Sequence, residues 1–126
     1  MSRLLRSAVY FPVVDVDVSV DYFKRVLGFD PEYVAGTPCE FAIVQRDSQR
    51  IMLRRVAAPE RIVPNEGQGG TWDLFVWVEG LDALFEELTG RGAIVVYGPV
   101  VQASYGMREF AVRTPDGYVI GFGESA

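Results

Sequence analysis

Few side chains in this sequence could perform nucleophilic, metal or acid–base chemistry. The chain has no histidine, and neutral imidazole is the usual ligand for zinc, nickel or iron. Its single cysteine, Cys39, has no histidine to activate it as a nucleophile. The glycines lack the strand-to-helix context of a phosphate-binding loop, and they include Gly67, Gly69 and Gly70. The sequence therefore excludes the common histidine-dependent sites and predicts neither a metal nor a cofactor.

Carboxylates are the remaining candidates for acid–base chemistry, and Asp73 is the first of them. Alternation over 72–79 predicts a strand with Asp73, Phe75 and Trp77 on one face, and both faces are expected to be buried. Buried carboxylates are costly and concentrate at functional sites. The alternative is a residue at the start of a strand that reaches solvent or pairs with an arginine. Glu109 is a second candidate acid or base.

An internal repeat predicts how these residues are positioned. The segment EFAIVQRDSQRIML (Glu40 to Leu53) aligns without a gap with EFAVRTPDGYVIGF (Glu109 to Phe122) at an offset of 69 residues. Two further matches fall in the same order, at offsets of 65 and 64 residues. The chain therefore reads as two copies of one unit, in which a strand and a helix precede a three-stranded meander.

Local signals predict the elements of each copy. Residues 8–16 read as a strand interrupted by Pro12, followed by a helix that Asp17 caps and Gly28 ends. In the second copy Asp82 is expected to cap a helix, and Gly90 and Gly92 to close it. A short strand at 32–34, a strand at 93–97 and an irregular stretch at 100–105 complete the reading. Hairpin turns are expected at 46–49 and 114–117, and a connector rich in proline and glycine at 55–71.

Bulk composition limits the classes of partner. The chain has 126 residues, 49% of them hydrophobic, which is typical of one globular domain. A net charge of −5 argues against nucleic-acid binding and permits cationic ligands. No apolar run approaches the roughly 20 residues of a membrane-spanning helix. The start of the chain lacks the apolar segment of a secretory signal, so a cytoplasmic location is expected.

Two groups of residues resemble the vicinal oxygen chelate superfamily, which includes glyoxalase I, extradiol dioxygenases, and fosfomycin- and bleomycin-resistance proteins. They are Asp15-Val16-Asp17 with Ser19, Tyr22-Phe23 and Val26 to Phe29, and Pro115-Asp116-Gly117 with Ile120 and Phe122. The resemblance covers nearly the whole chain. It implies an α+β fold of two tandem βαβββ units, with an eight-stranded mixed sheet curled around a cleft and helices on its outer face. We expect one domain, with unit 1 at about 5–56 and unit 2 at about 71–124.

The resemblance also implies four positions for metal ligands, at the first and last strands of each unit. In this chain they are Ala8, Met52, Asp73 and Gly121. Three of the four offer no ligand, and one carboxylate does not hold a divalent ion. A metal site like that of the metal-dependent members is therefore not expected.

The same positions imply a cleft lined by aromatic side chains. Strand parity assigns to it Tyr10, Met52, Arg54, Asp73, Phe75, Trp77 and Gly121, and the last hairpin adds Tyr105, Arg108 and Glu109. Which of Arg108 and Glu109 faces inward is left open. Each of these residues also has a structural reading: the aromatic residues and Met52 could fill a core, Gly121 could relieve a close backbone approach, and Arg54 could be solvated.

Function follows from the missing ligands and the expected aromatic cleft. The first hypothesis is a metal-independent protein similar to bleomycin-resistance proteins, which sequesters a hydrophobic, aromatic or cationic small molecule. The alternative is an enzyme of the same fold, of lyase, isomerase or dioxygenase type, which uses Asp73 or Glu109 as an acid or base. A scaffold without a ligand is a third. A homodimer is expected, because closed two-fold dimers are the commonest assembly.

Overall fold

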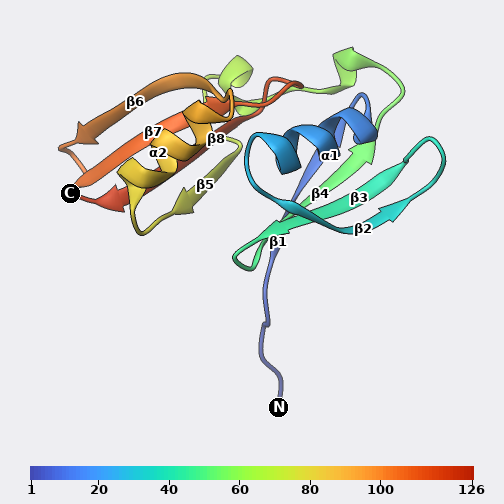
Figure 1. The fold of residues 1–126 in the computed structure, drawn as a ribbon, viewed down its shortest axis with the longest axis horizontal. Helices are drawn as coiled ribbons and strands as arrows, with labels where there is room; N and C mark the ends of the chain where they lie inside the picture. The colour runs from blue at the N-terminus through green and yellow to red at the C-terminus, as the bar shows by residue number, and fades with distance from the viewer. The chain divides into compact units, whose positions relative to one another are not determined.

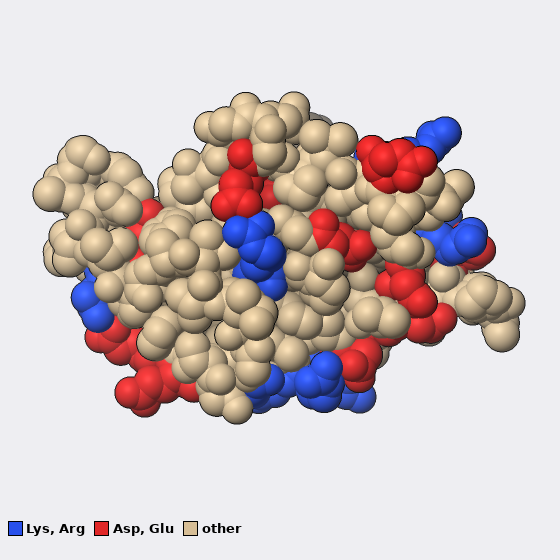
Figure 2. All heavy atoms as spheres, turned by 90° about the horizontal axis from the view of Figure 1, so that it is seen from above, with Lys and Arg blue, Asp and Glu red and all other residues tan.

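The computed structural model describes residues 1–126 and divides them into two compact units, 1–62 and 63–126. None of its helices is both long and apolar enough to cross a bilayer. Basic and acidic side chains are interspersed on the face that Figure 2 presents, without a large patch of one sign.

Unit 1 is a four-stranded sheet with one helix packed on it (Figure 1). The strand order is β1-β4-β3-β2, in which β1 runs parallel to β4 and the other neighbours are antiparallel. Its elements are β1 (Ala8–Val13), α1 (Val16–Arg25), β2 (Asp30–Ala35), β3 (Phe41–Arg46), β4 (Gln49–Arg55) and the 3-10 turn η1 (Pro59–Arg61).

Unit 2 repeats this topology with the order β5-β8-β7-β6. Its elements are the 3-10 turn η2 (Asn65–Gln68), β5 (Leu74–Trp77), α2 (Leu81–Gly90), β6 (Ile94–Gln102), β7 (Met107–Arg113) and β8 (Val119–Ser125). The predicted α+β fold of two tandem βαβββ units is confirmed. The eight strands are divided between two four-stranded sheets.

The core of each unit lies between its helix and one face of its sheet. In unit 1 the buried side chains come from α1 and the strands beneath it, and include Phe23, Leu27, Val44, Ile51 and Leu53. In unit 2 they include Leu81, Leu88, Phe110, Val112 and Ile120. The helical spacing of apolar residues read from the sequence produces this contact. The opposite face of each sheet carries the candidate site residues.

The helix starts differ from the sequence prediction. Asp15 caps α1, because its Oδ1 accepts a hydrogen bond from Val18 N at 3.0 Å. The predicted cap, Asp17, lies in the first turn, and its carboxylate accepts from Cys39 N at 3.2 Å. At α2 the N-cap is Gly80 rather than Asp82. The oxygens of Glu124 accept from Gly80 N and Leu81 N at 2.8 and 3.1 Å, so a residue of β8 does the capping.

Strand lengths also differ from the predictions. β1 ends at Val13, because the helix begins three residues later. β6 continues through two register shifts to Gln102, where an irregular segment was predicted. The expectation that both faces of the 72–79 segment are buried is wrong, since the side chain of Trp77 is 75% exposed.

Both predicted hairpin turns form, but they differ in length. In unit 1 Asp47 and Ser48 have positive φ angles and join Arg46 to its strand partner Gln49. In unit 2 Thr114 N bonds to Tyr118 O across a three-residue turn. One extra residue therefore separates the paired strands of unit 2.

This extra residue changes which positions of the two units are equivalent. Ala42 pairs with Leu53, whereas Phe110 pairs with Phe122. The β4 and β8 members are 69 residues apart (122 − 53), but the β3 and β7 members are 68 apart (110 − 42). The gapless match of the two Glu-Phe-Ala segments is therefore displaced by one residue, and Glu109 occupies the position of Phe41 rather than that of Glu40.

Candidate functional site

Unit 2 contains a hollow of about 350 Å³ on the face of its sheet opposite α2, lined by Trp72, Phe75, Trp77, Tyr105 and Met107. We call it the aromatic hollow. The sequence predicted Phe75, Trp77 and Tyr105 as site residues and missed Trp72 and Met107. Alternation over the predicted strand 72–79 would assign Trp72 to the face opposite Phe75, but Trp72 precedes β5 and does not follow that alternation. Met107 begins β7, two residues before Glu109, and shares its parity.

Two glycines of β8 allow the aromatic rings to pack against the sheet. A Cβ atom on Gly121 would lie 2.6 Å from ring atoms of Trp72, and one on Gly123 would lie 2.5 Å from Phe75 Cζ. The groups close to Gly121 are therefore side-chain rings, and not the backbone segment that one reading of the sequence proposed. The space that its missing side chain leaves is filled by Trp72.

The rings form a continuous apolar wall. The centroids of Trp72 and Phe75 are 4.7 Å apart, and those of Phe75 and Trp77 are 5.2 Å apart, with edge-to-face geometry in both pairs. Such contacts stabilise ring orientation. Trp77 stands at the open end of this wall with most of its surface exposed.

A buried carboxylate lies behind the wall. Glu109 is only 1% exposed, and its Oε1 accepts hydrogen bonds from the hydroxyls of Tyr97 and Tyr105 at 2.8 and 2.7 Å. The Tyr97 hydroxyl also accepts from Trp72 Nε1 at 2.8 Å. The other carboxylate oxygen, Oε2, is buried and has no hydrogen-bond partner. An unsatisfied buried oxygen is rare and costly in a native protein.

The two phenols that bond to Glu109 remain protonated over a wide pH range. Burial and then the carboxylate raise the pKa of Tyr97 to about 12, against the opposing effect of the Trp72 hydrogen bond. Partial desolvation and the bond to Glu109 raise the pKa of Tyr105 to about 12 as well, although its side chain is 51% exposed overall. Both hydroxyls are therefore donors to Glu109 at neutral pH.

The structure separates Arg108 from Glu109. Glu109 shares a face of the sheet with Phe75 and Trp77, whereas Arg108 donates to Asp82 Oδ1 at 2.9 Å at the start of α2. Consecutive residues of a strand point to opposite faces. Of these two residues, Glu109 is therefore the one on the face of the aromatic hollow, and Arg108 lies on the face that packs against α2.

Asp73 has a structural partner for each carboxylate oxygen. Oδ1 accepts from Asn65 N and Oδ2 from Val119 N, both at 2.8 Å. The carboxylate thus ties the segment before β5 to the start of β8. This use of both oxygens makes Asp73 a poor general base.

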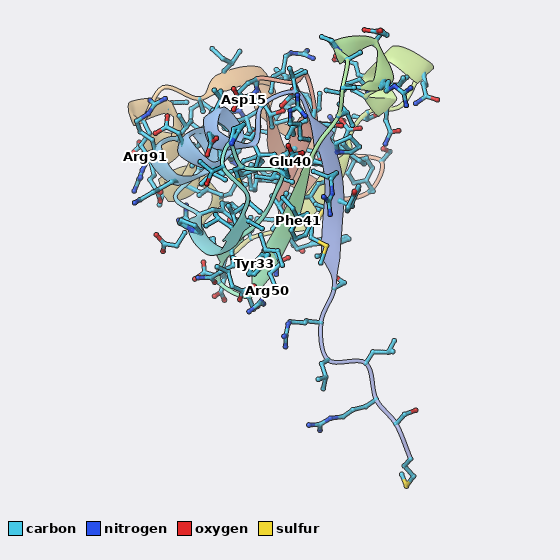
Figure 3. The ribbon with its side chains drawn as sticks, turned by 90° about the vertical axis from the view of Figure 1, so that its right-hand side faces the viewer. Asp15, Tyr33, Glu40, Phe41, Arg50 and Arg91 are labelled. Carbon is cyan, nitrogen blue, oxygen red and sulfur yellow. The ribbon has the colours of Figure 1, made fainter.

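Among the predicted site residues of unit 1, Arg54 contacts an aromatic ring. The guanidinium carbon of Arg54 lies 4.7 Å from the centroid of the Phe41 ring, and Tyr33 packs against Phe41 at 6.2 Å. Figure 3 shows Tyr33 and Phe41 side by side. Tyr10 and Met52 are strand partners on the same sheet. Tyr33 and Phe41 were not predicted.

The four positions that correspond to metal ligands do not fit a metal ion. Ala8 and Gly121 carry no donor atom, Met52 offers a thioether, and Asp73 already bonds to two backbone amides. No group of three histidine, cysteine, aspartate or glutamate side chains lies close enough to hold an ion.

Comparisons with known proteins agree with this architecture. Residues 6–122 match the Glyoxalase/Bleomycin resistance protein/Dioxygenase superfamily. No curated protein sequence is similar enough to count as a relative. Among solved structures, TioX from Micromonospora sp. ML1 is 25% identical with a TM-score of 0.77, over 97% of this chain and 99% of TioX.

Two further solved structures share the fold at lower identity. TnmS3, an antibiotic binding protein from Streptomyces sp. CB03234, is 22% identical with a TM-score of 0.73, over 100% of this chain and 99% of its own. The bleomycin-binding protein of bleomycin-producing Streptomyces verticillus, solved with copper(II)-bleomycin, is 23% identical with a TM-score of 0.70 over the full length of both chains.

Proposed function

The chain belongs to the Glyoxalase/Bleomycin resistance protein/Dioxygenase superfamily, and we propose that it is a metal-independent protein that sequesters a small aromatic molecule. Structures that share its fold include an antibiotic binding protein and a bleomycin-binding protein. These names support small-molecule binding as a use of this fold.

The aromatic hollow is the observation that carries the proposal. Its volume of about 350 Å³ lies at the lower end of the roughly 300–1,000 Å³ typical of ligand pockets. Its lining combines two tryptophans, a phenylalanine, a tyrosine and a methionine. A tryptophan that is 75% exposed at the opening costs apolar hydration in the free protein, which a stacked ligand would relieve.

The direct test is binding of a neutral aromatic probe, N-phenyl-1-naphthylamine, whose fluorescence rises in apolar surroundings. We expect saturable binding with one probe per unit 2, and weaker binding by Trp77→Phe because stacking area is lost. Arg61→Ala, in the exposed turn η1 of unit 1, serves as the control and should bind as wild type does. Equal affinity of Trp77→Phe and wild type would place the binding surface elsewhere.

Metal independence is the second part of the proposal. It is supported by the chemistry of Ala8, Met52, Asp73 and Gly121, which supply no set of ligands. The expected result is that chelation with EDTA leaves probe binding unchanged and that elemental analysis finds far less than one transition metal ion per chain. Close to one zinc, nickel, manganese or iron per chain would contradict it.

The assembly and location follow the same proposal. We expect a homodimer, because each unit has a sheet face with exposed aromatic residues, among them Tyr10, Tyr33 and Trp77. We also expect the protein to reside in the cytoplasm. Multi-angle light scattering tests the dimer, and a monomer at micromolar concentration would refute it.

An enzymatic function is the second candidate, and a particular observation favours Glu109 over Asp73 for it. Glu109 bonds to Tyr105, which lines the aromatic hollow, whereas both oxygens of Asp73 serve backbone amides. A carboxylate beside a hollow can act as an acid or base. Turnover of a bound molecule that Glu109→Gln abolishes without loss of affinity would favour this candidate.

A further inference from the structure

The position of Glu109 bears on the charge of the ligand, which the aromatic wall alone does not determine. The carboxylate sits on β7 opposite Gly123, and the space above that glycine is filled by Phe75 and Met107. Both of those side chains line the aromatic hollow. Glu109 is therefore directly behind the wall, with Tyr105 as the side chain that both lines the hollow and covers the carboxylate.

The partners of Glu109 leave one buried carboxylate oxygen without a hydrogen bond. Both hydrogen bonds of the carboxylate reach Oε1, and no basic side chain pairs with it. The ion pairs of the arginines in unit 2 involve Glu87, Asp82 and Glu66 instead. A buried anion without a counter-ion is costly, and a cation bound next to it removes that cost.

We propose that Glu109 is a binding residue for the cationic nitrogen group of a planar aromatic ligand, an inference that rests on the proposed binding function. The ring system stacks on Trp77 and contacts Phe75, whose ring is inclined at 71° to that of Trp77, and a protonated nitrogen donates to Glu109 Oε2. The half-exposed Tyr105 ring moves aside to admit it, within the turn between β6 and β7. The ligand class is thus an aromatic amine, amidine or related heterocycle that is protonated at neutral pH.

The chemistry of the wall supports a cation as well. Cation–π attraction to tryptophan and tyrosine favours positive ligands near such rings, and a charge-assisted hydrogen bond is about twice as strong as a neutral one. The net charge of −5 favours approach of a cation over that of an anion. An anionic aromatic ligand would meet Glu109 with no compensating arginine in the hollow.

Two probes of similar size test the inference. Proflavine is a planar three-ring cation with amino groups, and N-phenyl-1-naphthylamine is a neutral three-ring amine. Affinities are measured by titration calorimetry for wild type, Glu109→Gln and the control Glu86→Gln, which removes the same charge from an exposed position of α2. Thermal unfolding followed by circular dichroism checks that each variant is folded.

We expect Glu109→Gln to weaken proflavine binding at least tenfold while changing the affinity for N-phenyl-1-naphthylamine less than twofold. Glu86→Gln should change neither. If Glu109→Gln leaves proflavine binding intact while Trp77→Phe weakens both probes, the inference is wrong and the proposed function stands. If neither probe binds wild type, both fail. If Glu109→Gln weakens both probes equally, Glu109 only shapes the hollow, and the inference is again wrong.

Discussion

The two units share one topology but use the equivalent face of their sheets in opposite ways. In unit 1 Phe41 pairs with Arg54, and in unit 2 the equivalent pair is Glu109 and Gly123. A half-buried aromatic ring with a cation over it corresponds to a buried carboxylate opposite a glycine. The glycines of β8 admit Trp72 and Phe75 onto the sheet, whereas Met52 and Arg54 occupy the same positions of β4.

This difference shows how a duplicated unit acquires a site without a change of topology. Two glycines and one extra residue in a turn contribute to the difference. The glycines make room for large rings, and the longer turn shifts β7 by one residue relative to the gapless alignment. As a result Glu109 points to the face of the aromatic hollow, while Glu40 of the matching string is exposed and pairs with Arg55 at 3.6 Å.

The largest expected effect tests this structural equivalence. Phe110→Ala should lower the free energy of unfolding by about 3–5 kcal/mol, since it opens a cavity in a core. Phe110 is fully buried and lies 5.2 Å from the ring centroids of both Phe85 and Phe122. Phe41→Ala should cost only about 1 kcal/mol, because half-buried positions lose less area. Urea denaturation of both variants checks this. Similar losses of unfolding free energy would support the gapless alignment, in which Phe41 and Phe110 are equivalent.

Much of the fold could be predicted because its signals are periodic. The repeat located the two units, helical spacing located α1 and α2, and the turn residues at 46–49 and 114–117 located both hairpins. The errors have local causes. Asp15 and Asp17 are both suitable helix caps two residues apart, and the cap of α2 comes from Glu124, 43 residues after Leu81 along the chain. A contact between residues so far apart along the chain leaves no local sequence pattern from which it could be predicted.

The site was less predictable than the fold. Strand parity correctly grouped Phe75 with Trp77, but it failed at Asp73, whose carboxylate is used by two backbone amides. Trp72 lies before β5, so the alternation expected over 72–79 assigned it to the wrong face. The orientation of Glu109 depends on the length of the following turn. A gapped alignment that allowed one extra residue in the Thr114 to Tyr118 turn would have found it.

The second-largest expected effect concerns the hydrogen bonds that join Trp72, Tyr97 and Glu109 in unit 2. Tyr97→Phe should lower the free energy of unfolding by about 1–3 kcal/mol, because it leaves Trp72 Nε1 unpartnered and takes one donor from Glu109. Tyr33→Phe in unit 1 is the matched control, since Tyr33 is exposed, and should stay within about 0.5 kcal/mol of wild type. Equal losses would mean that the chain from Trp72 to Glu109 adds nothing to stability.

The same tyrosine gives unit 2 a dependence on alkaline pH. The pKa of Tyr97 is raised from 10.0 to about 12 in the folded protein, so the fold favours the neutral phenol. Its contribution is complete below pH 10, and is lost as pH rises from about 10 to about 12, where the unfolded chain ionises first. Tyr22 and Tyr118 add similar losses, because burial raises the pKa of each to about 12.

The contribution of Tyr97 is isolated by comparing wild type with Tyr97→Phe at several pH values. The gap in unfolding free energy between the two proteins should narrow between pH 10 and 12, since the variant lacks this phenol. A gap that stays constant over this range would show that Tyr97 titrates with its ordinary pKa. Urea midpoints measured at each pH are sufficient for the test.

The smallest effects distinguish the helix caps of the two units. Asp15→Ala removes the side chain that caps α1 and should cost about 0.5–2 kcal/mol. Glu124→Gln removes the charge and one of the two acceptor oxygens, but its amide oxygen still accepts from one of Gly80 N and Leu81 N. Its cost should therefore be smaller than that of Asp15→Ala, which removes the capping group entirely. The two backbone amides lower the pKa of Glu124. Its contribution is therefore present at neutral pH and lost as pH falls through that lowered pKa.

Thermal unfolding at neutral pH and at pH values below the ordinary glutamate range should show the Glu124→Gln difference vanish on acidification. A difference that persists after the carboxylate is protonated would mean that packing, and not charge at the start of α2, is what β8 contributes to that helix.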